Sequence, residues 1–257
     1  MPSFSRAIAA VCAALMLVAA VPVRAAEPAD PKRSDFERML KDYLAEHPEA
    51  IQDALDLLAS RKAAAKAELQ KAAIKANGGE LFSSLRQVTL GNRAGDVTLV
   101  EFFDYNCGYC KRALTDLIQL MKNDPKLKVV LKEYPILGPD SVEAARVAVA
   151  VRMQDAGERY LAFHRKLLEN RGRNDKARAL AAAEEAGLDM ARLERDMASE
   201  EVTKSLDEST RLGKALAING TPGYVVGERV IVGALGEQVL KDSIAATRSQ
   251  GSGIRSQ

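Results

Sequence analysis

From Val97 to Leu114 the sequence reads VTLVEFFDYNCGYCKRAL. Residues 96–103 form a nearly continuous apolar run, which is typical of a β-strand that is covered on both faces. Cys107 and Cys110 follow this run in a C-x-x-C spacing. An amphipathic helix is predicted directly after them, because apolar residues recur on one face at Ala113, Leu114, Leu117, Ile118 and Met121.

Outside this stretch the pattern predicts a mixed α/β chain. Asn123-Asp124-Pro125 ends the helix, and a strand–helix–strand unit of this length implies a right-handed parallel crossover. The other predicted elements are strands at 87–90 and 127–134, helices only at 139–217, strands at 223–226 and 229–232, and a final helix at about 236–247. The expected order is therefore βαβ, a helical insertion, and ββα.

The first 25 residues have the pattern of a secretory signal peptide. Arg6 charges the start, residues 7–21 are apolar, and Val23-Arg24-Ala25 offers small residues for cleavage. The apolar run is shorter than the about 20 residues that span a bilayer, so a cleaved signal at 1–25 is expected, with an uncleaved anchor as the alternative. Cys12 lies inside this segment and would leave with it.

Composition limits the possible functions of the 257-residue chain. Apolar residues make up 47% of it, enough for one large domain with an appendage. Without the predicted signal, 35 Lys and Arg face 35 Asp and Glu, so a nucleic-acid partner is not expected. We divide the mature chain into a helical extension at 26–80 and a main domain at 81–257 that contains the insertion 139–217.

Two readings of the helical extension remain open. Apolar residues recur at helical spacing in two segments separated by Pro48: Phe36, Met39, Leu40, Tyr43 and Leu44, then Ile51, Leu55, Leu58, Ala65, Leu69 and Ala72. Asn77-Gly78-Gly79 is a stop signal. Residues 35–76 are either a helical hairpin packed on its own domain or an oligomerisation stalk, and the long, thin stripe favours the stalk.

The mature chain keeps only Cys107 and Cys110. Disulfides that stabilise exported proteins usually close long loops, so a four-residue ring points to a bond that opens and closes. Cys107 stands at the helix start, where unpaired N–H groups and the helix dipole favour a thiolate that meets solvent. Cys110 is in phase with the buried face. Cys107 is therefore the expected attacking sulfur, and Cys110 resolves the mixed disulfide.

Metal binding is the competing reading of a C-x-x-C. A structural zinc site needs four ligands, and only His47 and His164 accompany the cysteines. His164 lies among core-facing residues and is expected to be a buried core histidine. We predict no resident metal, although two thiolates suit Cu(I).

Two further residues are candidates for the site. Glu101 is the only acid inside the apolar strand, and a buried carboxylate needs a reason such as accepting a proton near Cys110. The alternative places Glu101 at a solvated strand end. Pro222, in Asn219-Gly220-Thr221-Pro222-Gly223, precedes a strand, where proline is permitted.

The segment from Glu101 to Lys111 resembles the DsbA family of thioredoxin-like proteins, and the resemblance covers roughly residues 86–248. Lys132–Gly138 and Gly220–Pro222 are also similar, and the nearest branch includes the suppressor-of-copper-sensitivity protein ScsC and Com1-like proteins. The resemblance implies a thioredoxin-like fold with a helical insertion. It also implies that Pro222 is cis and faces the cysteines, and that Thr221 presents its backbone to an extended substrate.

The resemblance also raises Glu101 as the buried acid of the site. We further expect Gly108 and Tyr109 to contact substrate. No cofactor is expected beyond the redox-active Cys107–Cys110 disulfide.

The expected function is thiol–disulfide exchange on exported proteins in the periplasm, as a disulfide isomerase or moderate oxidase. Many strong oxidases of the family carry Pro-His between the cysteines, whereas this chain has Gly108-Tyr109, which predicts a less oxidising pair. Expected partners are exported substrates, a membrane redox partner that recycles the pair, and further copies of the chain in a homo-oligomer such as a trimer. The alternatives are Cu(I) handling through the same cysteines and a holdase whose cysteines are incidental.

Overall fold

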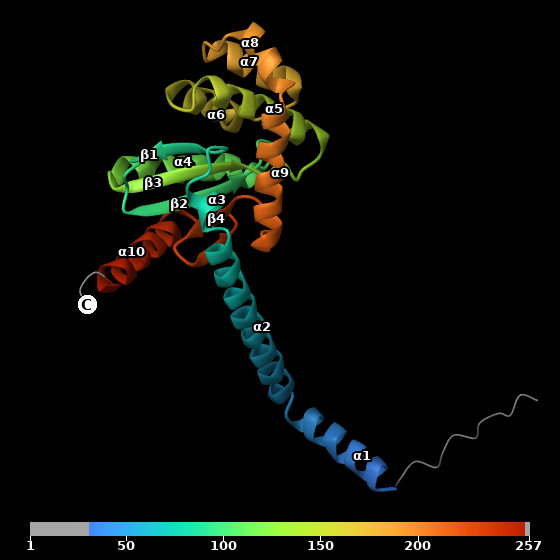
Figure 1. Ribbon diagram of the computed structural model, residues 1–257. Coiled ribbons are helices and arrows are strands. Elements are labelled where there is room, and N and C mark those ends of the chain that lie inside the picture. Colours follow the sequence, from blue (N-terminus) through green and yellow to red (C-terminus); the bar gives the residue numbers. More distant parts are fainter. Residues whose placement is uncertain (1–30, 255–257) are drawn as a thin grey trace, which may run out of the picture. The chain divides into compact units, whose positions relative to one another are not determined.

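The computed structural model describes residues 31–254, so the predicted signal peptide lies outside the described part (Figure 1). The chain divides into two compact units, Met1–Leu58 and Ala59–Gln257. The helices are α1 (Pro31–Glu46), α2 (Glu49–Ala76), α3 (Gly78–Phe82), α4 (Gly108–Asn123), α5 (Pro139–Gln154), α6 (Glu158–Glu169), α7 (Lys176–Glu185), α8 (Met190–Met197), α9 (Glu200–Ala215) and α10 (Glu237–Ile254). The strands are β1 (Val88–Gly91), β2 (Val97–Phe103), β3 (Leu127–Glu133), β4 (Gly223–Val226) and β5 (Arg229–Val232).

The five strands form one mixed sheet in the order β1-β3-β2-β4-β5. Strands β2 and β3 are parallel, as the strand–helix–strand pattern predicted, and the other neighbours are antiparallel. Phe102 near the end of β2 pairs with Gly223 at the start of β4. This register brings the Thr221-Pro222 segment to the end of β2, where the cysteine turn begins.

Both faces of the sheet are covered, which explains the apolar run in β2. Leu99 and Phe103 point into a core formed with α4, the helical insertion and α10, whereas Val100 and Phe102 point into a second core. The second core is closed by the end of α2, by α3 and by α9, through Ile74, Leu81, Leu212 and Leu216. Glu101 is in phase with Leu99 and Phe103, because side chains alternate along a strand. It therefore faces α4.

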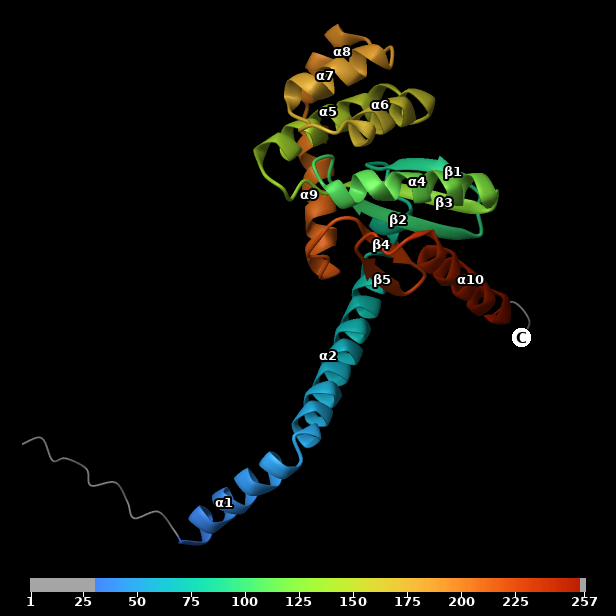
Figure 2. The ribbon, with the colours of Figure 1, turned by 180° about the vertical axis from the view of Figure 1, so that it is seen from behind.

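The region 139–217 is helical, as predicted, and comprises α5 to α9 (Figures 1 and 2). Helix α5 contacts α6, α7, α8 and α9 and is the centre of this group. The buried face of α5 carries small side chains, among them Ala144, Ala145, Ala148 and Ala150. Small residues let neighbouring helices approach closely. The helices of the insertion can therefore lie close around α5.

The N-terminal helices are long and expose most of their apolar residues. Among residues 31–58 of the first unit, the exposed large apolar side chains are Phe36, Met39, Leu40, Tyr43, Ile51, Leu55, Leu57 and Leu58. In the other unit, Gln70 and Ile74 of α2 are buried, and the Gln70 amide donates to the Leu216 carbonyl at 2.8 Å. The predicted stop near Asn77 ends α2, but a short helix α3 follows it. No helix between residues 31 and 254 is long and apolar enough to cross a membrane.

A buried ion pair crosses from the sheet to α9. Lys132 of β3 is fully buried, and its ammonium donates to the Glu208 carboxylate at 2.8 Å and to the Glu80 carbonyl at 2.7 Å. Removing one member of a buried pair leaves an uncompensated charge, which costs about 3–5 kcal/mol.

We therefore expect Glu208→Leu to lower the free energy of unfolding by about 3–5 kcal/mol, and the double variant Lys132→Met, Glu208→Leu to recover most of this loss. Denaturant unfolding of the three proteins measures the difference. The exposed pair of Lys204 and Glu200 is the control, since Glu200→Gln should leave the free energy of unfolding almost unchanged. A double variant as unstable as the single one would contradict this account.

Candidate active site

Cys107 is the N-cap residue of α4, with extended backbone angles (φ −79°, ψ 115°). Its N–H donates to the Asp104 carbonyl at 3.0 Å, and its carbonyl accepts from Lys111 N at 3.1 Å. The strand β2 thus ends in a tight turn that places the sulfur at the first turn of α4, where backbone N–H groups lack helical partners. The predicted helix start is confirmed.

The environment of Cys107 lowers the pKa of its thiol to about 5. The largest cause is a hydrogen bond from the Cys110 thiol, and Thr221 and the N–H groups of Cys110 and Tyr109 add to it against the effect of burial. The Oγ1 atom of Thr221 is buried without a hydrogen-bond partner among residues 31–254, so its hydroxyl is available to the Cys107 sulfur. These donors stabilise the thiolate, so Cys107 is an anion at neutral pH.

The expectation that Cys107 meets solvent is wrong, because only 6% of the residue is exposed. The segment before β4 lies against the sulfur, and in its protonated form the thiol donates to the Thr221 carbonyl at 3.1 Å. Gly108 and Tyr109, in contrast, are exposed. The Tyr109 ring carries the Arg112 guanidinium 4.3 Å from its centre.

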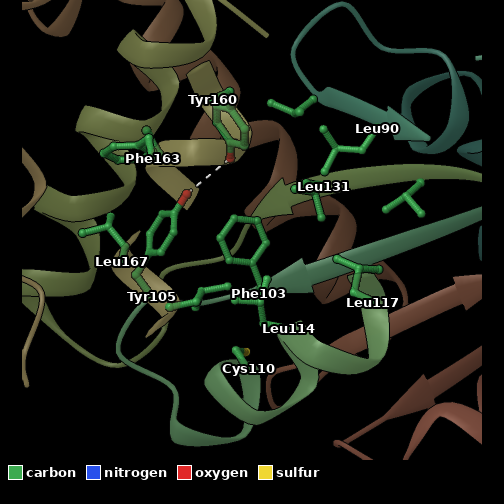
Figure 3. Close-up of a cluster of buried hydrophobic side chains, with 14 of the residues drawn as sticks. Leu90, Phe103, Tyr105, Cys110, Leu114, Leu117, Leu131, Tyr160, Phe163 and Leu167 are labelled. Carbon is green, nitrogen blue, oxygen red and sulfur yellow. Dashed lines mark hydrogen bonds between the residues drawn. The ribbon is translucent and has the colours of Figure 1, made fainter. Parts of the chain in front are cut away.

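Cys110 is fully buried, as its helical phase predicted. Figure 3 shows it below Phe103 and next to Leu114, at the edge of the first core. Burial raises the pKa of the Cys110 thiol far above its ordinary value, and the hydrogen bond to Cys107 and the charge of Glu101 raise it further. The two sulfurs therefore differ sharply: one is held as an anion and the other as a protonated donor. Both cysteines are free thiols in the structure.

Glu101 is 3% exposed, so its placement at a solvated strand end is wrong. It pairs across the sheet with Tyr224 of β4, whose hydroxyl hydrogen-bonds the carboxyl group. Burial raises the pKa of Glu101 to about 8, and the charge of Cys107 contributes to the increase. The charge of Glu101 also acts on Cys110, so the acid lies within electrostatic reach of both sulfurs.

The Thr221–Pro222 peptide bond is cis, which confirms what the resemblance implied. Both residues are buried, and the Pro222 carbonyl accepts from Gly233 N at 2.8 Å. The sheet register explains their position, because Gly223 pairs with Phe102 five residues before Cys107. The candidate residues Cys107, Cys110, Glu101, Thr221 and Pro222 are thus brought together from two segments more than 100 positions apart.

Sequence reasoning missed the polar groups that hold the active-site turn. Asp104 and Asn174 are both buried. The Asp104 carboxylate accepts from Asn106 N, and the Asn174 amide donates to the Tyr105 carbonyl. A second missed feature is a buried polar chain that includes the hydrogen bond between the hydroxyls of Tyr105 and Tyr160 (Figure 3). Tyr160 also donates to Glu133 at 2.7 Å, and the Tyr105 hydroxyl also hydrogen-bonds His164 Nδ1 at 3.2 Å. His164 itself is buried, as predicted, and burial lowers its pKa to about 3. Of these missed residues, only Asp104 could have been found from the local sequence pattern, because it is an acid directly after a buried strand.

Two sulfurs of opposite ionisation, held at the start of a helix that follows a parallel strand, are the arrangement of a thioredoxin-like thiol–disulfide oxidoreductase. Comparison with protein families agrees. The family described as DSBA-like thioredoxin domain matches residues 98–245, which is more than half of the chain. The protein therefore belongs to this family of DsbA-like oxidoreductases.

Solved structures lead to the same family. The chain is 41% identical to a thioredoxin-like oxidoreductase from Silicibacter pomeroyi, with a TM-score of 0.64 over 66% of this chain and 97% of that one. It is 30% identical to the thiol-disulfide exchange protein alpha-DsbA2 from Wolbachia pipientis (TM-score 0.65; 71% and 97% covered). It is 25% identical to the catalytic domain of ScsC from Proteus mirabilis (TM-score 0.63; 69% and 97% covered).

Curated relatives differ in length from this chain. It spans 24% of a Na(+)/H(+) antiporter from Salinispora arenicola, with 28% identity over 158 residues that make up 61% of the chain. It spans 75% of a probable disulfide bond formation protein D from Bacillus cereus, with 21% identity over 163 residues that make up 59% of the chain.

We predict that the hydrogen bond from position 110 controls the ionisation of Cys107. In Cys110→Ala the donor is lost, and the pKa of Cys107 should rise by about 1–2 pH units, since a hydrogen bond to a charged group contributes about 1.5–3 kcal/mol. In Cys110→Ser a hydroxyl donor remains, and the pKa should stay near that of the native protein. Thiolate absorbance against pH measures both variants. Equal pKa values in the two would contradict the assignment.

Proposed function

We propose that the protein exchanges disulfides in exported proteins in the periplasm, as a disulfide isomerase or moderate oxidase. The observation that carries the proposal is the unequal placement of the two sulfurs: Cys107 caps α4, where its environment lowers the pKa of its thiol, and Cys110 is fully buried, which raises the pKa of its thiol. The anion attacks a substrate disulfide and forms a mixed disulfide, and the substrate sulfur leaves as a thiolate. Cys110 can then attack Cys107, which releases the substrate as a dithiol and leaves the Cys107–Cys110 disulfide. Oxidation of a substrate dithiol is the reverse of these steps and starts from that disulfide, which is reduced. Alternatively, a substrate thiol releases Cys107 and leaves the substrate rearranged.

The pKa of Cys107 supports the moderate character. The value of about 5 lies between the roughly 3.5 of the strong oxidant DsbA and the roughly 7 of thioredoxin. A more stable thiolate favours the reduced form of the pair and makes its disulfide more oxidising. The absence of a histidine between the cysteines, where the chain has Gly108 and Tyr109, agrees with an intermediate potential. The direction of net electron flow would then depend on a membrane redox partner.

Periplasmic location rests on the signal-like segment at residues 1–25, which would direct the mature chain out of the cytoplasm. A compartment that is kept oxidising also suits a chain whose two mature cysteines form a redox pair.

Substrate would bind along the segment of Thr221 and Pro222. The exposed Tyr109 ring adds a flat apolar surface beside the sulfur. An extended peptide laid against this segment would hydrogen-bond to its backbone, which is a strand-addition mode of recognition.

Glu101 would serve as the proton acceptor for Cys110. The buried thiol must lose its proton before it attacks the mixed disulfide, and a carboxylate with a pKa of about 8 is a base matched to that step near neutral pH.

Glu101→Gln should therefore slow the release of a mixed disulfide by about 10²-fold or more, the range of general-base contributions. In the native protein the release rate should rise with pH towards about 8, where Glu101 ionises, and this rise should be absent in the variant. Rapid-quench trapping of the mixed disulfide against pH measures it. A native-like pH profile in Glu101→Gln would remove the role from Glu101.

Stability gives the matching control for this variant. The pKa of Glu101 is higher in the folded protein than its ordinary value of 4.5. The folded state therefore keeps a proton that the unfolded state loses, and native stability falls as pH rises from 4.5 to 8. Glu101→Gln, which does not ionise, should gain stability relative to the native protein across this window. A slower release in a more stable variant cannot result from unfolding.

Isomerase activity would also draw on the N-terminal helices. The apolar side chains that are exposed between residues 36 and 58 suit association with other copies of the chain. We therefore propose a homo-oligomer such as a trimer. The boundary at Leu58 indicates where to cut, because Ile74 and Leu81 beyond it belong to the core of the second unit.

Deleting residues 26–58 from the mature chain should convert the oligomer to a monomer, and the recovery of native pairing in a substrate with scrambled disulfides should fall several-fold. Oxidation of a reduced peptide should persist, because the cysteine site is untouched. Cys107→Ser in the full mature chain should abolish both activities. Light scattering and a refolding assay measure the outcomes. A native chain that is monomeric, or full activity in Cys107→Ser, would contradict the proposal.

Cu(I) handling is the second candidate, favoured by the proximity of the two sulfurs, which share a hydrogen bond. Among residues 31–254 no group of three or more His, Cys, Asp or Glu side chains could hold a metal ion. The raised pKa of Cys110 also opposes the second thiolate that Cu(I) would need. Anaerobic Cu(I) titration of the reduced protein separates the candidates, because binding no tighter than that of a simple dithiol removes this one.

A further inference from the structure

The carboxylate of Asp104 holds the active-site turn, residues 104–106, through hydrogen bonds. Asp104 follows β2 directly, is 2% exposed, and its carboxylate accepts four hydrogen bonds. The donors are Asn106 N at 2.8 Å and Ser141 Oγ at 2.7 Å on Oδ1, and Ile136 N at 2.9 Å and Leu137 N at 3.0 Å on Oδ2. Charge-assisted hydrogen bonds of this kind are roughly twice as strong as neutral ones.

The main chain of Asp104 contacts both cysteines. Its carbonyl accepts from Cys107 N at 3.0 Å, and its backbone hydrogen-bonds the Cys110 sulfur. The same residue thus touches both halves of the redox pair through its backbone. Through its side chain it holds the loop between β3 and α5, where Ile136 and Leu137 are exposed.

The chemistry of the four donors requires a carboxylate at this position. Three backbone N–H groups and one hydroxyl converge on two oxygens, and an ionised carboxylate is the short side chain that only accepts. An asparagine of the same shape would turn an NH₂ group towards two of these donors. Buried N–H groups without a partner are costly. The turn would then have to move.

A second set of contacts continues the support into the helical insertion. Asn106, whose N–H binds Asp104, accepts from Asn174 N at 2.7 Å and donates to the Asn174 carbonyl at 3.0 Å. Asn174 is fully buried and also donates to the Tyr105 carbonyl at 2.8 Å. The turn of residues 104–106 is therefore held from β2, from the β3–α5 loop and from the loop before α7.

We propose that Asp104 is a positioning residue for disulfide exchange: it fixes the first turn of α4, and with it both sulfurs, against the β3–α5 loop. The proposal rests on the proposed function and deepens it. Asp104 does not touch substrate. It sets the distances from the Cys107 sulfur to its donors, the Cys110 thiol and the N–H groups of Tyr109 and Cys110.

Asp104→Asn tests this role, because charge and position act in opposite directions. Removing a nearby negative charge alone would favour the Cys107 thiolate and lower its pKa. Loosening the turn would weaken the donors and raise that pKa. We expect the pKa to rise by about one pH unit, equivalent to a tenfold change in the ionisation equilibrium, and the rate of Cys107 alkylation at pH 4, below both pKa values, to fall several-fold. Thiolate absorbance and alkylation kinetics measure the two effects.

Two further variants keep the test decisive. Ser141→Ala removes one donor and keeps the carboxylate, so it should raise the pKa of Cys107 by a smaller amount than Asp104→Asn. This variant also tests the proposal if Asp104→Asn does not fold. Asp189→Asn is the control, because Asp189 caps α8 by accepting from Arg192 N at 3.0 Å, away from the cysteines. It should leave the pKa of Cys107 unchanged.

A folded Asp104→Asn with an unchanged or lowered pKa of Cys107 would overturn the proposal, as would an unchanged pKa in Ser141→Ala if Asp104→Asn does not fold. The proposed function fails separately, if the native protein exchanges no disulfides at all. Native exchange together with native ionisation in the folded Asp104→Asn variant would remove only the role of Asp104.

Discussion

The hydrogen bond from the Cys110 thiol to the Cys107 sulfur makes two chemically identical residues unequal. The proton of this hydrogen bond stabilises the Cys107 thiolate and lowers its pKa. Burial raises the pKa of Cys110, and donating the same hydrogen bond raises it further. Backbone N–H groups at the start of α4 act in the same direction on Cys107, and burial acts on Cys110. The attacking and resolving roles proposed for the pair follow from this division.

The sheet supplies the constraint that makes this geometry possible. Because β2 lies between β3 and β4, its end is flanked by the β3–α5 loop on one side and by the Thr221–Pro222 segment on the other. The alternation of side chains along β2 also turns Glu101 towards α4 and the cysteines. One register thus places the thiolate, its buried acid and the backbone that we propose faces substrate together, although they come from distant parts of the chain.

Much of this could be predicted from the sequence because the signals were local. The apolar run before Cys107, the helical phase of Cys110 and the strands at 223–226 and 229–232 all depend on near neighbours, and the structure has them as expected. The burial of Cys107 was not predicted, since Thr221 lies 114 positions away. The same holds for Asn174 and for the pairing of Lys132 with Glu208, which arise only when the insertion packs on the sheet. The cis bond at Pro222 was implied by family resemblance and not by local pattern.

The central claim is the unequal ionisation of the two sulfurs, and selective alkylation of the reduced native protein tests it most directly. Iodoacetamide labelling across pH 4–8, with the labelled peptides identified by mass spectrometry, reports each cysteine separately. The account predicts that labelling at Cys107 follows an ionisation near pH 5 while Cys110 stays unmodified throughout. Labelling of Cys107 that follows the ionisation of an ordinary cysteine near pH 8.5, or equal labelling of the two sulfurs, would contradict it.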